Sequence, residues 1–266
     1  MEDTVKLEVL TQEEINILSE NAENFLNRLG EYEEKRLIKS KERVAENGEV
    51  FTPRNIVKDM LDLDGVKEYS FLIDKTFLEP ACGDGNFLIQ IIARKLMAVL
   101  GNSETFDIDV ARCLASIYGV DIANDNINES RERMLNAVKM RYEESGHNLS
   151  ADYEKSFRYI LNRNIILGNT LTNERLPENE PIVPSDMNPK QRKIFIREEK
   201  KLRDNRCNEF AIKDLRFSEW KFSGDQVQRV EYGASDMDTA IHTYDYIDVD
   251  KLSEQIDDSQ IEDDLI

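Results

Sequence analysis

The sequence predicts an α/β protein with a mostly parallel sheet and helices on both faces. Short apolar segments at 75–79, 117–121 and 165–168 are separated by longer segments of helical periodicity. This alternation is typical of parallel sheets, whose strands are joined by helices. Each apolar segment runs into a polar or glycine-containing stretch, as expected where a strand ends.

A helical N-terminal extension is expected over 1–47. Residues 11–29 have apolar side chains at helical spacing, Thr11 and Glu14 have the spacing of a capping box, and Gly30 can end the helix. Pro53 then stands where a further helix can begin.

The main domain is expected over 48–232. Helices are predicted at 86–100 and about 104–115 between the first two strands, and at about 123–144 and 151–163 between the second and third. These helices supply the crossover connections that parallel strands require.

An insertion at 172–210 is expected to interrupt this domain. Four of the six prolines fall within 172–189, which predicts a loop, and 190–206 contains eight Lys or Arg residues. The basic residues Arg192, Lys193, Arg197, Lys200 and Arg203 are candidates for binding DNA phosphates. A solvated helix face is the alternative interpretation of the same residues.

A β-hairpin and an acidic tail are expected after the insertion. Residues 215–222 and 227–232 are predicted strands around a turn at 223–225. From residue 235 onward the chain has eleven acidic residues and one lysine. We therefore expect 233–266 to be a tail, either a loose solvated arm or an acidic docking face.

Composition excludes several classes of protein. The 266 residues have a net charge of −19, so nucleic acid repels the chain as a whole, and contact with DNA needs a local basic surface or a basic partner. Three widely spaced cysteines and two isolated histidines predict neither a metal site nor a disulfide scaffold. With no leader pattern and no apolar run of membrane length, a cytoplasmic protein without membrane contact is expected.

The strongest chemical signal is the segment 77–88, in which an apolar strand runs through Pro80-Ala81-Cys82 into a turn with Gly83 and Gly85. Glycines permit positive φ and close approach of a ligand to the backbone. Phosphate-binding glycine patterns are absent from the sequence, so the pattern favours a nucleoside ligand without phosphates. Glu79 at the strand end can accept from a cationic ammonium group.

Two further strand ends complete a candidate nucleoside pocket. Asp121 ends the second strand, where an acid can bind ribose hydroxyls, and Asn169 follows the third, where an amide suits an adenine edge. Each residue alone can be a turn or cap residue. Ligands bind at the carboxyl ends of such strands, so the three ends together indicate one site.

Residues 48–171 resemble the cofactor half of DNA methyltransferases that modify the amino group of adenine, both the modification subunits of type I restriction systems and the methylase domains of fused type II enzymes. The resemblance rests on 48–53 and 79–85, in this order and spacing. It implies a Rossmann-like methyltransferase fold and S-adenosyl-L-methionine as cofactor. Asp84 replaces the family's frequent Ser or Thr, and Asn169 its usual Asp. The expected cofactor contacts are Phe51, Thr52, Pro53, Glu79, Pro80, Ala81, Gly83, Gly85, Phe87, Asp121, Ile122 and Asn169.

The family's catalytic tetrapeptide, [Asp/Asn/Ser]-Pro-Pro-[Tyr/Phe/Trp], is absent. Asn188-Pro189 lacks both the strand and the aromatic residue. The better candidate by position is the segment 217–220, in which Ser218 or Glu219 can accept from an amine and Trp220 can stack on a flipped base. The alternative is a hairpin strand with Trp220 packed against the sheet.

Three functions are consistent with these observations. The first is methyl transfer to adenine in DNA within a restriction–modification system, although the resemblance leaves RNA or protein open as acceptor. The second is a catalytically degenerate cofactor-binding subunit that needs a specificity partner, since the chain leaves no room for a separate target-recognition domain. The third is an acidic mimic of DNA, suggested by the charge of −19.

Overall fold

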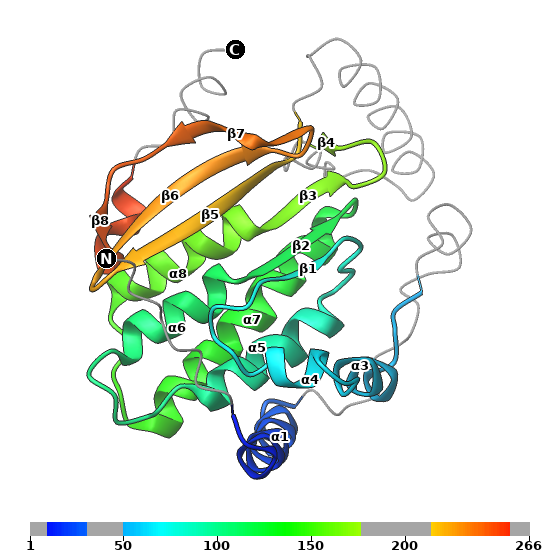
Figure 1. Cartoon of the computed structure of the whole chain (residues 1–266), viewed down its shortest axis with the longest axis vertical. Coiled ribbons are helices and arrows are strands. Elements are labelled where there is room, and N and C mark those ends of the chain that lie inside the picture. The colour runs from blue at the N-terminus through cyan, green and yellow to red at the C-terminus, as the bar shows by residue number, and fades with distance from the viewer. Residues whose placement is uncertain (1–9, 31–49, 177–213, 256–266) are drawn as a thin grey trace, which may run out of the picture.

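The computed structural model describes residues 10–30, 50–176 and 214–255, and these form a mixed α/β protein (Figure 1). Its helices are α1 (Gln12–Arg28), α3 (Arg54–Leu61), α4 (Val66–Tyr69), α5 (Asn86–Ala98), α6 (Phe106–Ala115), α7 (Asn124–Ser145), α8 (Ala151–Asn164) and the 3₁₀ helix η1 (Val249–Glu254). Its strands are β1 (Phe77–Glu79), β2 (Ile117–Asp121), β3 (Ile165–Asn169), β4 (Glu174–Arg175), β5 (Arg216–Ser223), β6 (Gln226–Gly233), β7 (Asp236–Thr243) and β8 (Ile247–Asp248).

The first sheet has the order β1-β2-β3-β4. β1 and β2 pair in parallel, as do β2 and β3, while the short β4 runs antiparallel to β3. The predicted parallel arrangement of the first three strands is therefore confirmed, and each follows the helices that the sequence predicted before it.

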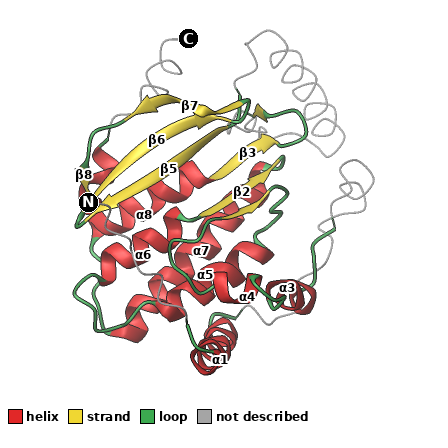
Figure 2. Ribbon diagram, in the orientation of Figure 1, coloured by secondary structure: helices red, strands yellow, loops and turns green. Residues whose placement is uncertain are grey.

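One face of this sheet packs against helices, which Figure 2 shows gathered on one side of the strands. Ile117, Ile165 and Leu167 are fully or almost fully buried in the main core, together with the apolar side chains of α5 and α7. Helix α1 joins this core through Phe25 and Leu26. The expected N-terminal extension thus contributes a helix to the main core.

The opposite face differs from the sequence prediction, which expected helices on both faces. Val120 and Ile166 pack there with Leu215, which directly precedes β5. The Tyr118 hydroxyl donates a hydrogen bond to the Ser218 carbonyl oxygen at 2.6 Å. A second, antiparallel sheet of order β5-β6-β7, with β8 paired to β6, thus covers this part of the face.

The predicted hairpin is confirmed. Of the two alternatives for the segment after Ser235, the loose solvated arm is wrong for residues 236–254, and the acidic docking face stays a prediction. Strand β7 pairs with β6, and the chain returns through β8 into η1. Val249 and Leu252 of η1 are buried in the main core. The acidic residues around these two apolar anchors concealed them in the sequence.

Strand β7 lies at the edge of the second sheet. Among the described residues it pairs only with β6, and nearly all of its side chains are exposed. Met237 and Ile241 have 54% and 50% of their surface accessible.

A buried lysine fixes the loop before β1. Lys95 on α5 is fully buried, and its ammonium donates to the carbonyl oxygens of Leu72 (2.7 Å), Ile73 (3.2 Å) and Lys75 (2.7 Å). Burial lowers the pKa of Lys95 to about 8. Hydrogen bonds to the three carbonyl oxygens offset the free-energy cost of burying the ammonium in the apolar core.

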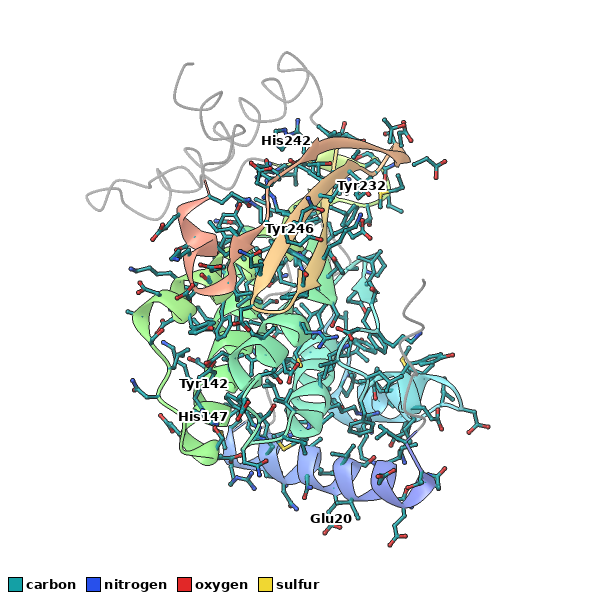
Figure 3. All side chains as sticks on the ribbon, turned by 60° about the vertical axis from the view of Figure 1, so that its left-hand side comes forward. Glu20, Tyr142, His147, Tyr232, His242 and Tyr246 are labelled. Atoms are coloured by element: carbon teal, nitrogen blue, oxygen red, sulfur yellow. The ribbon has the colours of Figure 1, made fainter. Side chains whose placement is uncertain are left out.

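Aromatic side chains pack together at the C-terminal end of α7. The Phe106 ring stacks on His147 at 4.2 Å and contacts Tyr142 edge-on at 5.0 Å. Figure 3 shows Tyr142 and His147 close together at this end.

Within the described parts of the chain, no helix combines the length and apolar character that a membrane crossing needs.

Candidate cofactor site

The carboxyl ends of β1, β2 and β3 lie side by side in a staggered row. Glu79 pairs with Gly119, and Asp121 pairs with Leu167, so each strand extends two residues beyond its neighbour. The Thr170 hydroxyl donates to the Pro80 carbonyl oxygen at 3.0 Å, a contact between residues 90 positions apart. This bond ties the segment after β3 to the segment after β1, across the end of β2.

The glycine-rich turn has the backbone conformation that the sequence predicts. Gly83 has φ of 53° and Gly85 has φ of 93°, both in the left-handed region that favours glycine. Gly85 is the N-cap of α5. A Cβ atom at Gly83 would lie 3.0 Å from the Phe51 ring, so the turn and this ring are in direct contact.

The segment 51–54 is fixed along the start of α5. Asn86 donates to the Thr52 carbonyl oxygen at 3.1 Å, and Gln90 donates to the Arg54 carbonyl oxygen at 2.9 Å. Phe51 is only 7% exposed, and Pro53 is the N-cap of α3. The structure therefore brings Phe51, Thr52 and Pro53 to the turn.

The Asp121 carboxylate already serves three internal donors. Its Oδ2 accepts from Gly83 N–H at 3.0 Å, and its Oδ1 accepts from Ala123 N–H at 2.8 Å and from Asn126 Nδ2 at 3.1 Å. A carboxylate has about four acceptor positions. One position on Oδ2 therefore remains for a ligand hydroxyl.

Burial changes the acidity of groups beside the turn. Glu79 is half-buried, and desolvation raises the pKa of its carboxyl even though Ala81 N–H donates to Oε1 at 3.3 Å. A cationic ligand group would reverse this shift. Burial, together with the carboxylates of Asp121 and Glu79, also raises the pKa of the Cys82 thiol, so this cysteine stays protonated.

The remaining expected contacts occupy different environments. Asn169 Oδ1 accepts from Leu171 N–H at 2.9 Å, which leaves one acceptor position on this oxygen. Ile122, next to Asp121, is 45% exposed at the same edge. Pro80 and Ala81 are exposed, whereas Phe87 packs against the main core.

The structure does not bring Ser218, Glu219 and Trp220 to this edge. They lie in the middle of β5, not at its end. Trp220 Nε1 donates to Asn164 Oδ1 at 2.9 Å, and Asn164 directly precedes β3, at its amino end. Trp220 thus occupies the opposite end of β3 from Asn169, which is the packed arrangement that the sequence left open as an alternative.

Ser218 and Glu219 have structural contacts of their own. The Ser218 side chain is 4% exposed. The Glu219 carboxylate accepts from the Tyr232 hydroxyl at 3.0 Å and lies 3.3 Å from Lys221 Nζ. The candidate phosphate-binding residues Arg192, Lys193, Arg197, Lys200 and Arg203 lie outside the described residues.

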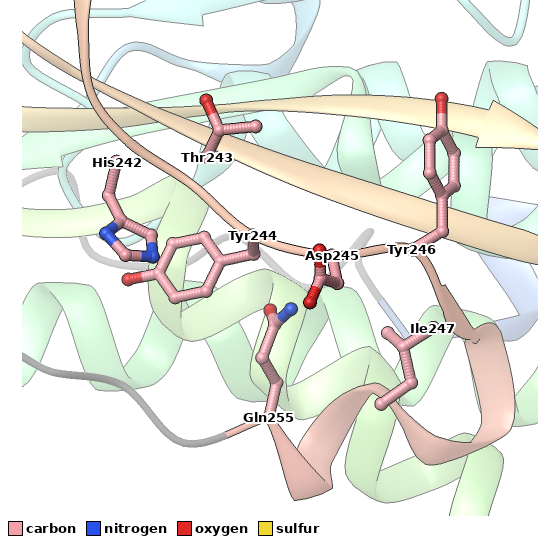
Figure 4. A pocket seen from close by; sticks show the side chains of 7 residues that line it. All are labelled: His242, Thr243, Tyr244, Asp245, Tyr246, Ile247 and Gln255. Atoms are coloured by element: carbon pink, nitrogen blue, oxygen red, sulfur yellow. The ribbon is translucent and has the colours of Figure 1, made fainter.

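A separate pocket of about 430 Å³ lies between β7, β8 and the end of η1 (Figure 4). Its lining residues are His242, Thr243, Tyr244, Asp245, Tyr246, Ile247 and Gln255. None of these is an expected cofactor contact. Among the described residues, no group of three or more potential metal-ligating side chains is found.

The sequence prediction missed two residues on α7, Ser130 and Asn126, that form hydrogen bonds with the glycine-rich turn and with Asp121. Ser130 donates to the Gly83 carbonyl oxygen at 3.0 Å, and Asn126 contacts Asp121. Their signal in the sequence is polar residues at one-turn spacing on a helix that must bury one face.

No protein-family model, no curated protein and no solved structure matches the chain. The fold itself defines a mixed α/β protein in which polar residues end three neighbouring parallel strands.

Proposed function

We propose that the chain binds S-adenosyl-L-methionine at the carboxyl ends of β1, β2 and β3, as the cofactor-binding part of a DNA methyltransferase that modifies the amino group of adenine. The observation that carries this proposal is the convergence of the three strand ends. Two hydrogen bonds keep these strand ends together, one from the Thr170 hydroxyl to the Pro80 carbonyl oxygen and one from Gly83 N–H to the Asp121 carboxylate.

Each part of the cofactor has a matching group at this edge. The desolvated Glu79 carboxylate suits the ammonium of the methionine moiety. Asp121 has an acceptor position for a ribose hydroxyl, and Asn169 offers amide groups to an adenine edge. Gly83 and Gly85 give the turn its left-handed backbone conformation beside these groups.

The chemistry of the transfer belongs largely to the cofactor, whose sulfonium supplies the driving force when it is bound. The contribution of this chain is positioning, which alone can lower a barrier substantially. Since β5 places Trp220 at the other end of β3, we propose no role in holding the target base for Ser218, Glu219 or Trp220. With a net charge of −19, the chain suits a role in which a partner specificity subunit makes most contacts with DNA.

Calorimetric titration of the chain with S-adenosyl-L-methionine tests the proposal. We expect micromolar binding, weakened by about tenfold or more in Asp121→Ala. Asp152→Ala is the matched control, because Asp152 lies exposed on α8. The absence of binding by folded wild-type protein would overturn the proposal.

Transfer of a labelled methyl group tests the acceptor. We expect label in DNA only when a partner that binds DNA is present, and none with Asp121→Ala. Label in RNA or protein, but not in DNA, would refute the DNA part of the proposal. A chain that binds no cofactor but forms a salt-sensitive complex with a basic nuclease would instead support mimicry of DNA, the function that the net charge alone suggests.

A further inference from the structure

Helix α7 buries a row of polar side chains, one turn apart, against the glycine-rich turn. Asn126, Ser130 and Arg133 are 1%, 0% and 8% exposed. Burying a polar side chain is unfavourable unless it finds hydrogen-bond partners. All three find them on the turn or on Asp121.

Two members of the row hold the atoms that border the expected ligand. Ser130 Oγ donates to the Gly83 carbonyl oxygen at 3.0 Å, and Asn126 Nδ2 donates to Asp121 Oδ1 at 3.1 Å. Gly83 N–H in turn donates to Asp121 Oδ2. The turn, the end of β2 and the buried face of α7 therefore form one closed set of hydrogen bonds.

Arg133 holds the other end of the turn. Its guanidinium donates to the Asp84 carbonyl oxygen at 2.5 Å and to Asn86 Oδ1 at 3.1 Å, and it lies 3.4 Å from Asp84 Oδ1. Between these contacts, a Cβ atom at Gly85 would lie 2.9 Å from Ser130 Oγ. The turn therefore rests directly on α7, with no space for a side chain between them.

We infer that Asn126, Ser130 and Arg133 are positioning residues that hold the glycine-rich turn and Asp121 in the geometry that binds the cofactor. This inference rests on the proposed function. The three side chains do not touch the ligand. They act by removing the conformational freedom that binding would otherwise have to restrict, and a preorganised site binds more tightly for that reason.

Ser130→Ala tests the inference with two readouts. We expect the Kd for S-adenosyl-L-methionine to rise about tenfold, since one buried hydrogen bond no longer fixes the turn. The amide resonance of Asp84 should shift, because its N–H belongs to the same peptide unit as the Gly83 carbonyl. Ser156→Ala is the matched control, because Ser156 is an equally buried serine on the neighbouring helix α8.

A second variant, Arg133→Lys, keeps the charge but loses the fork of donors, and it should weaken binding in the same direction. The inference is overturned if Ser130→Ala binds as tightly as Ser156→Ala, or if the Asp84 resonance does not move. Failure of the wild type to bind the cofactor refutes the proposed function. In that case the Asp84 resonance alone decides whether Ser130 holds the turn.

Discussion

A methyl group at Gly168 tests the contact between the two sheets. Gly168 lies in β3, and a Cβ atom there would stand 2.4 Å from Leu215 Cδ2 and 2.8 Å from the Glu174 carbonyl oxygen. Side-chain carbons do not approach other heavy atoms so closely. In Gly168→Ala, either Leu215 must leave its site or β4 must move away from β3.

The cost follows from how tightly Leu215 is held. Leu215 is 1% exposed and packs against Val120 and Ile166. Adding a methyl group to a packed core costs about 1–3 kcal/mol, so we expect Gly168→Ala to lower the free energy of unfolding by that amount. Leu215→Ala alone should cost about 2–5 kcal/mol, because it leaves a cavity.

Urea denaturation of both single variants and of the double variant measures the coupling. Removing the Leu215 side chain relieves part of the clash, so the double variant should be more stable than the sum of the single effects predicts, by about 1 kcal/mol. Gly101→Ala is the control, since its Cβ atom would meet Arg141 and Ser145 no closer than 3.4 Å. Additive effects, or a Gly168→Ala protein as stable as the wild type, would refute the described packing of the sheets.

Three further substitutions test other parts of the structure. Burial raises the pKa of Glu79, so the native state binds more protons than the unfolded state above the ordinary carboxyl pKa. The free energy of unfolding of the wild type should therefore fall relative to Glu79→Gln as the pH rises from about 4 to about 7, and parallel curves in acid and neutral buffers would contradict this. Trp220→Phe removes the hydrogen bond to Asn164 and should lower the free energy of unfolding by about 1–3 kcal/mol. Cofactor affinity should stay unchanged. A selective loss of methyl transfer at full stability would instead favour stacking of Trp220 on the target base. Lys95→Met leaves three backbone carbonyls without their donor and should cost roughly 3 kcal/mol in thermal or urea unfolding, whereas an unchanged midpoint would show that the ammonium stabilises nothing.

The parallel strands and the glycine-rich turn were predictable because their signals are local. Apolar runs such as 117–121 alternate with helical periodicity, and glycine at 83 and 85 marks positive φ directly. The same locality explains why α5 and α7 lie close to their predicted ranges.

The second sheet and the support of the turn depend on contacts distant in sequence. Trp220 meets Asn164 across 56 positions, and Ser130 meets Gly83 across 47. No pattern within one segment identifies such partners. The alternative of a loose arm over 236–254 failed for a related reason, because the many acidic residues concealed the two buried apolar residues Val249 and Leu252.

The acids of β7 bear on how the molecules behave in concentrated solution. Within the described part of the chain β7 is paired on one side, and it carries exposed apolar side chains such as Met237 and Ile241. A strand of this kind is a template for edge-to-edge association. Asp236 and Asp238 place negative charge on the same strand, so two such edges repel each other at neutral pH. Near the isoelectric point of about 4.6 the net charge of the molecule approaches zero, so the long-range repulsion between molecules disappears. Self-association through β7 is therefore expected to begin on the acid side, and added Lys or Glu on this strand should delay its onset.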